Sequence, residues 1–119
     1  MSAVYIPDFR QNKRNPHSKY NSTRTEYNGL TFDSKAEALR HSQLCLMLRT
    51  GQIKSFSRQP SFIISEAGGK AVRYRPDFIV WDGSNVWVED VKGFATAAFK
   101  AKSVMFREKY PYLELRIIK

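Results

Sequence analysis

The sequence has a single cysteine, no long apolar run and few acidic residues for its number of basic ones. Cys45 excludes an internal disulfide, and one cysteine with His17 and His41 cannot build a cysteine-rich zinc site. Any metal is therefore expected to be held by oxygen atoms. No apolar stretch approaches about 18 residues and no charged-then-apolar leader stands at the N-terminus, so we expect no membrane span, no signal peptide and a cytoplasmic location.

The charge balance is strongly positive. Twenty Lys plus Arg residues against eleven Asp plus Glu give a net charge of +9 and a pI near 9.9. Such a balance is typical of a protein that meets a polyanion, and nucleic acid is the first candidate, although a merely basic soluble protein has the same composition. An anionic membrane is less expected, because no long helix combines a basic face with an exposed apolar one.

The length of 119 residues predicts one folded domain with one core, residues 25–119, preceded by a basic flexible arm, residues 1–24. The segment "RQNKRNPHSKYNSTR" carries five Lys or Arg, no acid and almost nothing apolar, so it cannot bury enough surface to offset its ordering entropy. It is either a solvated terminus or a tail that contacts phosphates through Arg10, Lys13 and Arg14.

Local signals predict a small α/β domain. A turn at Asn28-Gly29 precedes a helix over 34–49 with a capping box, Ser34 and Glu37, and Gly51 ends that helix. Strand content follows around Phe56 and over 60–67. The remaining predicted elements are strands 71–81 and 86–92 joined by "DGSN", a helix over 96–109 with core residues Phe94, Phe99 and Phe106, and a last strand over 112–119. This order predicts a mixed sheet with flanking helices.

The stretch "YRPDFIVWDGSNVWVEDVKG" sets acids inside two apolar strands. A turn centred on Gly83 and Ser84 places Asp77 directly opposite Asp90, and strand alternation adds Lys92 to the same face. A longer loop would separate the two acids. The other face of the hairpin receives the remaining side chains: Phe78, Val80, Trp87, Glu89 and Val91.

Two opposed carboxylates repel each other by about 3 kcal/mol at ~5 Å and an effective dielectric of ~20, so a compensating charge is expected. Mg²⁺ compensates naturally, because it takes oxygen ligands from one or two carboxylates and keeps waters for a phosphate. Alternatively, the acids form an ordinary ion network with Arg73, Arg75 and Lys92.

On the first predicted helix, Glu37 begins a stripe that continues through His41, Leu44 and Leu48 and turns apolar. Glu37 can therefore face the sheet and reach the acidic pair, or it serves only the capping box with Ser34. His41 is more often a packed histidine than a ligand.

Glu37, the "PD" at Pro76-Asp77 and the "DVK" at Asp90-Val91-Lys92 resemble the PD-(D/E)XK nuclease superfamily. The longer pattern "FDSKAEALR", "RQP", "YRPDF", "EDVKG" is similar to small phage and prophage proteins of that superfamily, often described as Holliday-junction-resolvase-like. The resemblance covers roughly residues 27–118. It implies a restriction-endonuclease-like αβββαβ core with a four- to five-stranded mixed sheet flanked by helices.

The resemblance further implies an Mg²⁺-dependent DNA endonuclease in phage or prophage DNA recombination, acting in the bacterial cytoplasm, with Mn²⁺ as a substitute metal. Asp77, Asp90 and the backbone carbonyl of Val91 are then the metal ligands, and Glu37 completes the site directly or through water. Lys92 orients or deprotonates the attacking water. A four-way junction needs two coordinated cuts, so this version predicts a homodimer.

Other residues are candidate DNA contacts, and each also has an ordinary structural explanation. Gln59 in "RQP" enters the strand before the hairpin, and Arg73 and Arg75 flank the "PD" strand. One threonine and two lysines lie at the start of the second helix, whose N-terminus favours phosphate. The full set is Gln59, Arg73, Arg75, Thr96, Lys100 and Lys102.

The main rival is a non-catalytic DNA-binding module that retains the nuclease fold. A pure binder gains nothing from carboxylates beside phosphates, because each carboxylate repels the backbone that it is meant to attract. The acids therefore favour the enzyme. An RNA substrate is weaker, because no clear base-stacking aromatic motif is present.

Overall fold

The computed structural model of the chain describes residues 10–11 and 24–119. The chain divides into two compact units, Met1–Gly51 and Gln52–Lys119. Each unit has its own cluster of buried apolar side chains. The two units are therefore described one after the other. None of the described helices is long and apolar enough to cross a membrane.

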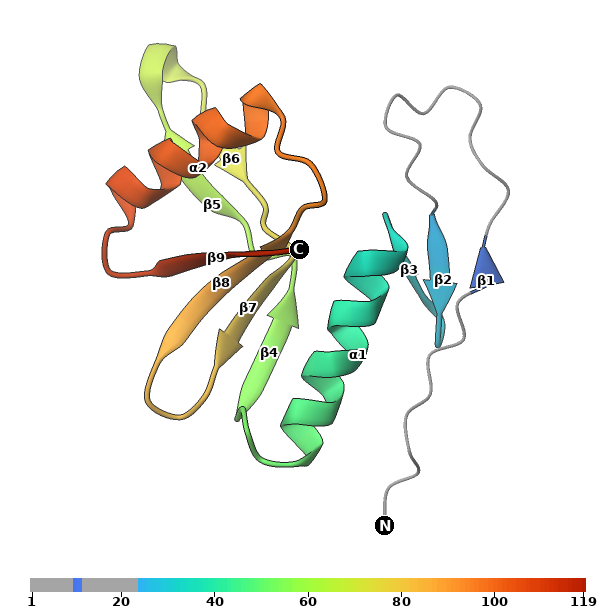
Figure 1. The fold of residues 1–119 in the computed structure, drawn as a ribbon. Coiled ribbons are helices and arrows are strands. Elements are labelled where there is room, and N and C mark those ends of the chain that lie inside the picture. The colour runs from blue at the N-terminus through green and yellow to red at the C-terminus, as the bar shows by residue number, and fades with distance from the viewer. Residues whose placement is uncertain (1–9, 12–23) are drawn as a thin grey trace. The chain divides into compact units, whose positions relative to one another are not determined.

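The first unit joins a small antiparallel sheet to one helix (Figure 1). Asn28 and Gly29 both have positive φ angles, 51° and 80°, which is the backbone that a tight hairpin turn requires, so the predicted turn is confirmed. Tyr27 and Phe32 pack in the core of this unit. Its elements are β1 (Arg10–Gln11), β2 (Thr25–Tyr27), β3 (Leu30–Phe32) and α1 (Lys35–Arg49).

Helix α1 begins where the capping residues predict. The hydroxyl of Ser34 accepts a hydrogen bond from the Glu37 N–H at 3.1 Å. Of the predicted stripe, Glu37, His41 and Leu44 are buried, whereas Leu48 is exposed. The ring of His41 lies 5.1 Å from that of Phe32, so His41 is a packed histidine.

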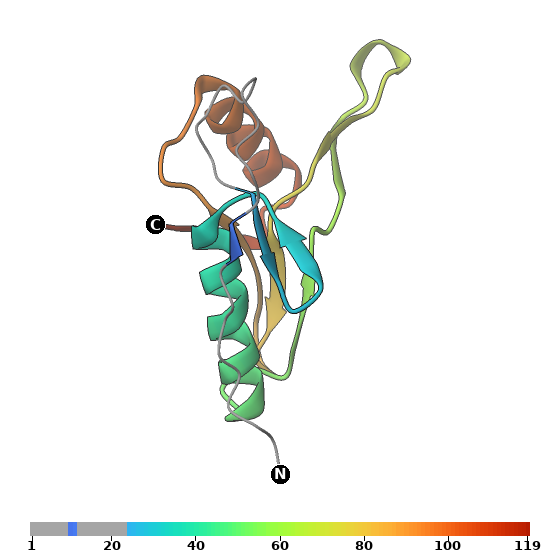
Figure 2. The same ribbon diagram turned by 90° about the vertical axis from the view of Figure 1, so that its right-hand side faces the viewer.

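The second unit is built on a four-stranded mixed sheet, as the sequence predicts. The strand order is β4-β7-β8-β9, and the last pair, β8 with β9, is parallel. A separate two-stranded ribbon, β5 with β6, reaches out beyond the sheet beside helix α2 (Figure 2). The elements are β4 (Ser55–Arg58), β5 (Phe62–Ser65), the short 3₁₀ helix η1 (Ala67–Gly69), β6 (Val72–Tyr74), β7 (Phe78–Trp81), β8 (Val86–Val91), α2 (Ala97–Lys109) and β9 (Glu114–Ile118).

The predicted continuous strand over 71–81 is wrong. The chain forms β6 and β7 in different sheets, with Arg75, Pro76 and Asp77 between them. Pro76 has no N–H to give to a strand ladder, and its ring restricts the residue before it, so the ladder stops here. The break changes which side chains of this segment can meet.

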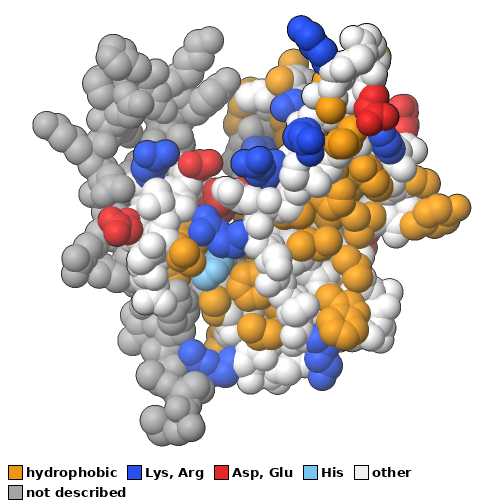
Figure 3. Space-filling view, turned by 180° about the vertical axis from the view of Figure 1, so that it is seen from behind, with side chains coloured by type: hydrophobic (Ala, Val, Ile, Leu, Met, Phe, Trp, Pro, Cys, Tyr) orange, Lys and Arg blue, Asp and Glu red, His pale blue; other side chains and the backbone are white. Residues whose placement is uncertain are grey.

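Helix α2 starts after Thr96, whose hydroxyl accepts the N–H of Phe99 at 3.1 Å. Phe106 is buried and Phe99 packs against the core cluster, as predicted. Phe94 is 80% exposed and precedes the helix, so its predicted core role is wrong. Trp81 and Val86 pair across the hairpin and are also exposed. Figure 3 shows apolar side chains gathered on the face that it draws.

Candidate active site

The hairpin of β7 and β8 has the register that the sequence predicts. Phe78 pairs with Glu89, which is the last pair of the regular ladder. Beyond it, the Asp77 N–H donates to the carbonyl oxygen of Glu89 at 3.0 Å, and Asp77 Oδ2 accepts the N–H of Val91 at 2.7 Å. Asp77 therefore contacts the residues on either side of Asp90, and the direct pairing of the two acids stays a prediction.

The turn that sets this register is fixed by its own side chain. Asp82 Oδ1 accepts the N–H groups of Ser84 at 2.8 Å and Asn85 at 2.7 Å. These backbone hydrogen bonds, that of Asn85 first, hold the pKa of Asp82 below its usual value. Gly83 has a φ angle of 103°, which most side chains do not tolerate. The "DGSN" sequence thus builds the turn that brings the acids together.

Both carboxylates are held by donors of the same unit. Asp77 Oδ2 accepts the backbone N–H of Val91 at 2.7 Å. Asp90 is 3% exposed; its Oδ2 accepts the hydroxyl of Tyr74, and its Oδ1 lies 3.4 Å from Lys92 Nζ. Because a buried carboxylate needs such partners, these contacts fix the position of the acidic pair.

Tyr74 is the site residue that the sequence reasoning missed. Its side chain is buried, and burial, followed by the hydrogen bond to Asp90, raises its pKa well above the usual value. The phenol therefore stays protonated and donates to the carboxylate. The signal that pointed to it is Pro76, which interrupts the strand and so removes the alternation that separates Tyr74 from the face of Asp77.

Lys92 follows β8 and combines two contacts. Besides the ion pair with Asp90, its ammonium group lies 5.1 Å from the centre of the Phe99 ring. The Lys92 side chain is 35% exposed. A partly exposed amine beside a buried carboxylate can meet a ligand from solvent while it neutralises the acid.

Glu89 lies on the opposite face of β8, as predicted. It is fully buried, and its Oε2 accepts the indole N–H of Trp87 at 2.8 Å. On the same side, the guanidinium of Arg116 stands 3.9 Å from the centre of the Trp87 ring. Glu89 is thus engaged in the packing of that face, and Asp90 is the acid that shares a face with Asp77.

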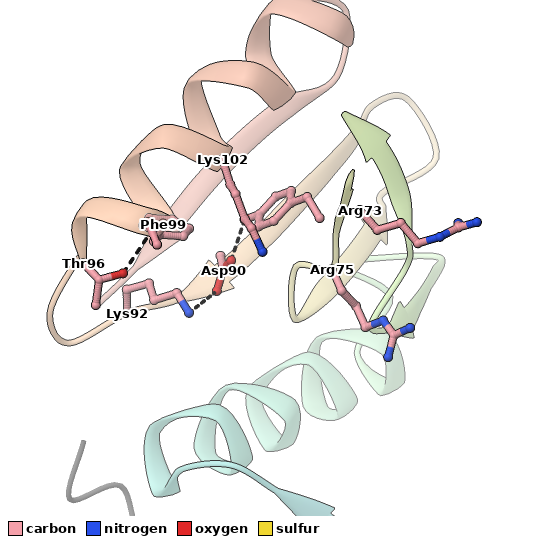
Figure 4. A pocket seen from close by; sticks show the side chains of 9 residues that line it. Arg73, Arg75, Asp90, Lys92, Thr96, Phe99 and Lys102 are labelled. Atoms are coloured by element: carbon pink, nitrogen blue, oxygen red, sulfur yellow. Dashed lines mark hydrogen bonds and ion pairs between the residues drawn. The ribbon is translucent and has the colours of Figure 1, made fainter. Parts of the chain in front are cut away.

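A pocket of about 520 Å³ opens above Asp90, between β6 and α2 (Figure 4). Four of the predicted DNA contacts line it, and Lys92 and Tyr74 line it as well. Lys100, by contrast, is exposed on α2 and is not part of the lining. The lining consists of Arg73, Tyr74, Arg75, Asp90, Lys92, Thr96, Ala98, Phe99 and Lys102.

Gln59 lies next to the acidic pair through its backbone. Its N–H donates to the carbonyl oxygen of Asp77 at 2.8 Å. Its φ angle is 51°, a left-handed conformation that is unusual for a residue other than glycine or asparagine. Such strain is common at functional sites, and the Gln59 side chain is exposed.

The other predicted site residues lie elsewhere. Glu37 belongs to α1 of the first unit, and its contribution to the metal site stays a prediction. Arg10 lies in β1, whereas Lys13 and Arg14 are outside the described residues. Their contact with DNA also stays a prediction.

The acidic pair suits a hard cation in the kind of atoms that it offers. Two neighbouring carboxylates make an oxygen donor set of the type that Mg²⁺ binds with retained waters, and the Val91 carbonyl stays a predicted ligand. No group of three or more His, Cys, Asp or Glu side chains within the described residues could hold a metal ion. Within Gln52–Lys119, the fit therefore rests on Asp77 and Asp90.

No curated protein and no solved structure matches the chain. A family model described as "Protein of unknown function (DUF1064)" matches residues 17–119. This match spans both units and includes the acidic pair, Lys92 and the pocket. The chain therefore belongs to the DUF1064 family.

Proposed function

We propose that the protein is an Mg²⁺-dependent endonuclease that hydrolyses phosphodiester bonds in DNA. The observation that carries this proposal is the acidic pair: Asp77, just before β7, contacts the residues on either side of Asp90 in β8, and Lys92 forms an ion pair with Asp90. Two carboxylates and an amine on one face, beside a cation-lined pocket, are the groups that metal-assisted phosphodiester hydrolysis needs.

The residues have distinct roles in this proposal. Asp77, Asp90 and the Val91 carbonyl hold the cation, and the contribution of Glu37 stays a prediction from the sequence. When bound, Mg²⁺ stabilises negative charge that develops on the phosphate and lowers the pKa of a coordinated water. Lys92 orients or deprotonates the attacking water and offsets charge on the phosphate. Mn²⁺ substitutes for Mg²⁺, because both accept the same oxygen ligands.

The fold assignment that accompanies this function is the restriction-endonuclease-like core of the PD-(D/E)XK superfamily. It is supported by the chain order: helix α1, the antiparallel strands β4, β7 and β8, helix α2, and then β9 parallel to β8. The β5–β6 ribbon is an insertion between β4 and β7 in this assignment. The acids lie where the two central strands of that order pair.

The proposed substrate is DNA, and a branched DNA is the preferred form. The net charge of +9 supports binding to a polyanion. The Holliday-junction-resolvase-like resemblance suggests a role in phage or prophage recombination within the bacterial cytoplasm. Two coordinated cuts in a four-way junction require two sites, so we expect a homodimer.

The rival is a DNA-binding module without turnover. The pocket cations serve both functions equally, so they do not separate them. The acidic pair does, because Asp77 and Asp90 oppose phosphate binding unless a cation joins them. We therefore favour the enzyme.

The test compares a labelled four-way junction, a flap and a linear duplex of the same sequence, each with wild-type and Asp90→Ala protein, in Mg²⁺ and in EDTA. We expect symmetric nicks in the junction with Mg²⁺ and none with EDTA or Asp90→Ala. Cutting of all three substrates would remove the structural preference but keep the nuclease. Binding without cutting in Mg²⁺ and in Mn²⁺ would contradict hydrolysis and support the binding module.

A further inference from the structure

We infer that the pocket between β6 and α2 binds one unpaired nucleotide of a DNA strand, with Lys102 as its principal phosphate contact. The inference rests on the proposed function for the identity of the polymer as DNA. It deepens that function by assigning the strand that enters the site as single-stranded. It does not depend on metal binding or on cleavage.

The pocket has two basic walls and an acidic floor. Lys102 reaches from α2 toward Asp90 and faces Lys92 across it, while Arg73 and Arg75 extend from the β6 wall away from Asp90 (Figure 4). Positive charge therefore continues from Lys92 and Lys102, on either side of Asp90, to the arginines on the outer side of β6. A strand whose backbone follows this course meets a cation at each wall.

Three of the four basic side chains that line the pocket form no ion pair with another described residue. Within the described residues, Lys92 is paired with Asp90, and no carboxylate lies within ion-pair distance of Arg73, Arg75 or Lys102. Asp90 is the one acid among the nine lining residues, and it is already engaged by Lys92 and Tyr74. The pocket thus keeps a positive excess that an anion from solvent can neutralise.

The size of the pocket selects what can enter. About 520 Å³ is the size of pocket that encloses a small-molecule ligand, so it takes roughly one nucleotide. A nucleotide inside a duplex must first leave its stack and its pair, whereas an unpaired one enters without that cost. Phe99, which is half-buried in the lining with Lys92 over its ring, adds apolar surface to the pocket wall.

Lys109 supplies a matched control for Lys102. Both lysines are exposed on α2, and removal of either changes the net charge of the protein equally. Only Lys102 lines the pocket. A difference between the two variants therefore reports the pocket rather than the general charge.

The experiment measures binding of a fluorescent oligothymidine and of a blunt hairpin duplex of the same length to the full chain in EDTA, across a range of salt concentrations. We expect the oligothymidine to bind more tightly than the duplex. Lys102→Ala should weaken oligothymidine binding roughly fivefold at about 0.1 M salt and reduce the log–log salt slope by about 0.7, the counterion release of one single-strand phosphate contact. Lys109→Ala should change affinity less than about twofold, because it removes no pocket contact.

Equal effects of Lys102→Ala and Lys109→Ala, or tighter binding of the duplex, would overturn the inference. The outcome is separate from that of the proposed function. If binding depends on Lys102 but the protein never cuts DNA, the nucleotide-binding pocket stands and the proposed hydrolysis is wrong. If the protein cuts DNA but the two lysines are equivalent, the hydrolysis stands and the nucleotide-binding pocket is wrong.

Discussion

Repulsion within the acidic pair should lower the free energy of unfolding of the metal-free protein. Asp77 contacts the backbone of Glu89 and Val91, on either side of Asp90, so we take the two carboxylates to be ~5 Å apart, the usual spacing of neighbouring side chains on paired strands. At an effective dielectric of ~20, two like charges at this distance repel by about 3 kcal/mol before salt screening. Because small domains are stable by only about 5 to 15 kcal/mol, the repulsion is measurable.

Asp77→Asn removes this repulsion with little other change. The carbonyl oxygen of the asparagine can still accept the N–H of Val91, which Asp77 Oδ2 accepts at 2.7 Å. Replacement of a charged acceptor by a neutral one costs about 1 kcal/mol. The free energy of unfolding in EDTA at low salt should therefore rise by about 2 kcal/mol, the difference between the repulsion and this loss.

The assay is urea unfolding of wild type and Asp77→Asn in EDTA and in Mg²⁺, with Asp82→Asn as a control. Asp82 lies in the same hairpin, and its substitution also removes one negative charge, but it faces no opposing carboxylate. The free energy of unfolding of Asp82→Asn should therefore be equal to that of wild type or lower. Wild type should gain about 2.7 kcal/mol when free Mg²⁺ is about 100 times its Kd, and Asp77→Asn should gain much less.

Two results would refute this reasoning. If Asp77→Asn is less stable than wild type in EDTA, the carboxylate of Asp77 contributes more through its contacts than it costs through repulsion. If wild type responds to Mg²⁺ no more than Asp77→Asn does, the acidic pair is not the cation site.

Two further substitutions probe the surroundings of the acids. Tyr74→Phe removes the donor to Asp90 and should raise the Mg²⁺ concentration for half-maximal cleavage about tenfold. Tyr110→Phe is the control, because it removes only the hydrogen bond to the Ile63 carbonyl and should leave that concentration unchanged. Equal concentrations for the two variants would show that Tyr74 has no role at the metal. Gln59→Gly should change the free energy of unfolding by no more than about 0.5 kcal/mol, because relief of the left-handed strain offsets the added entropy of the unfolded chain. The same substitution should slow cleavage. An unchanged cleavage rate would show that the Gln59 amide acts in neither binding nor catalysis.

The features that could be predicted are those with local causes. The turn chemistry of Asp82 and Gly83 determines the register of the hairpin, and with it the approach of Asp77 to the residues that flank Asp90. The cap at Ser34 likewise marks the start of α1. In each case, a few neighbouring residues are sufficient, because the hydrogen bonds that define the element lie within a few positions of one another.

The features that could not be predicted depend on contacts distant in sequence. In a continuous strand, Tyr74 and Asp77 are separated by an odd number of positions and point to opposite faces. The break at Pro76 sends β6 to the ribbon with β5 and lets Tyr74 reach Asp90 instead. The pocket has the same origin, because it forms only when β6 and α2 come together.

The most direct test of the account compares two isosteric substitutions at adjacent positions of β8. Asp90→Asn and Glu89→Gln each replace a buried carboxylate by an amide that can still accept the observed hydrogen bond, from Tyr74 or from Trp87. The measurement is the Mg²⁺-dependent cleavage rate of a four-way junction by each folded variant. The account predicts that Asp90→Asn abolishes cleavage and Glu89→Gln largely keeps it. The reverse ranking would place the catalytic acid on the other face of the sheet and contradict the site described above.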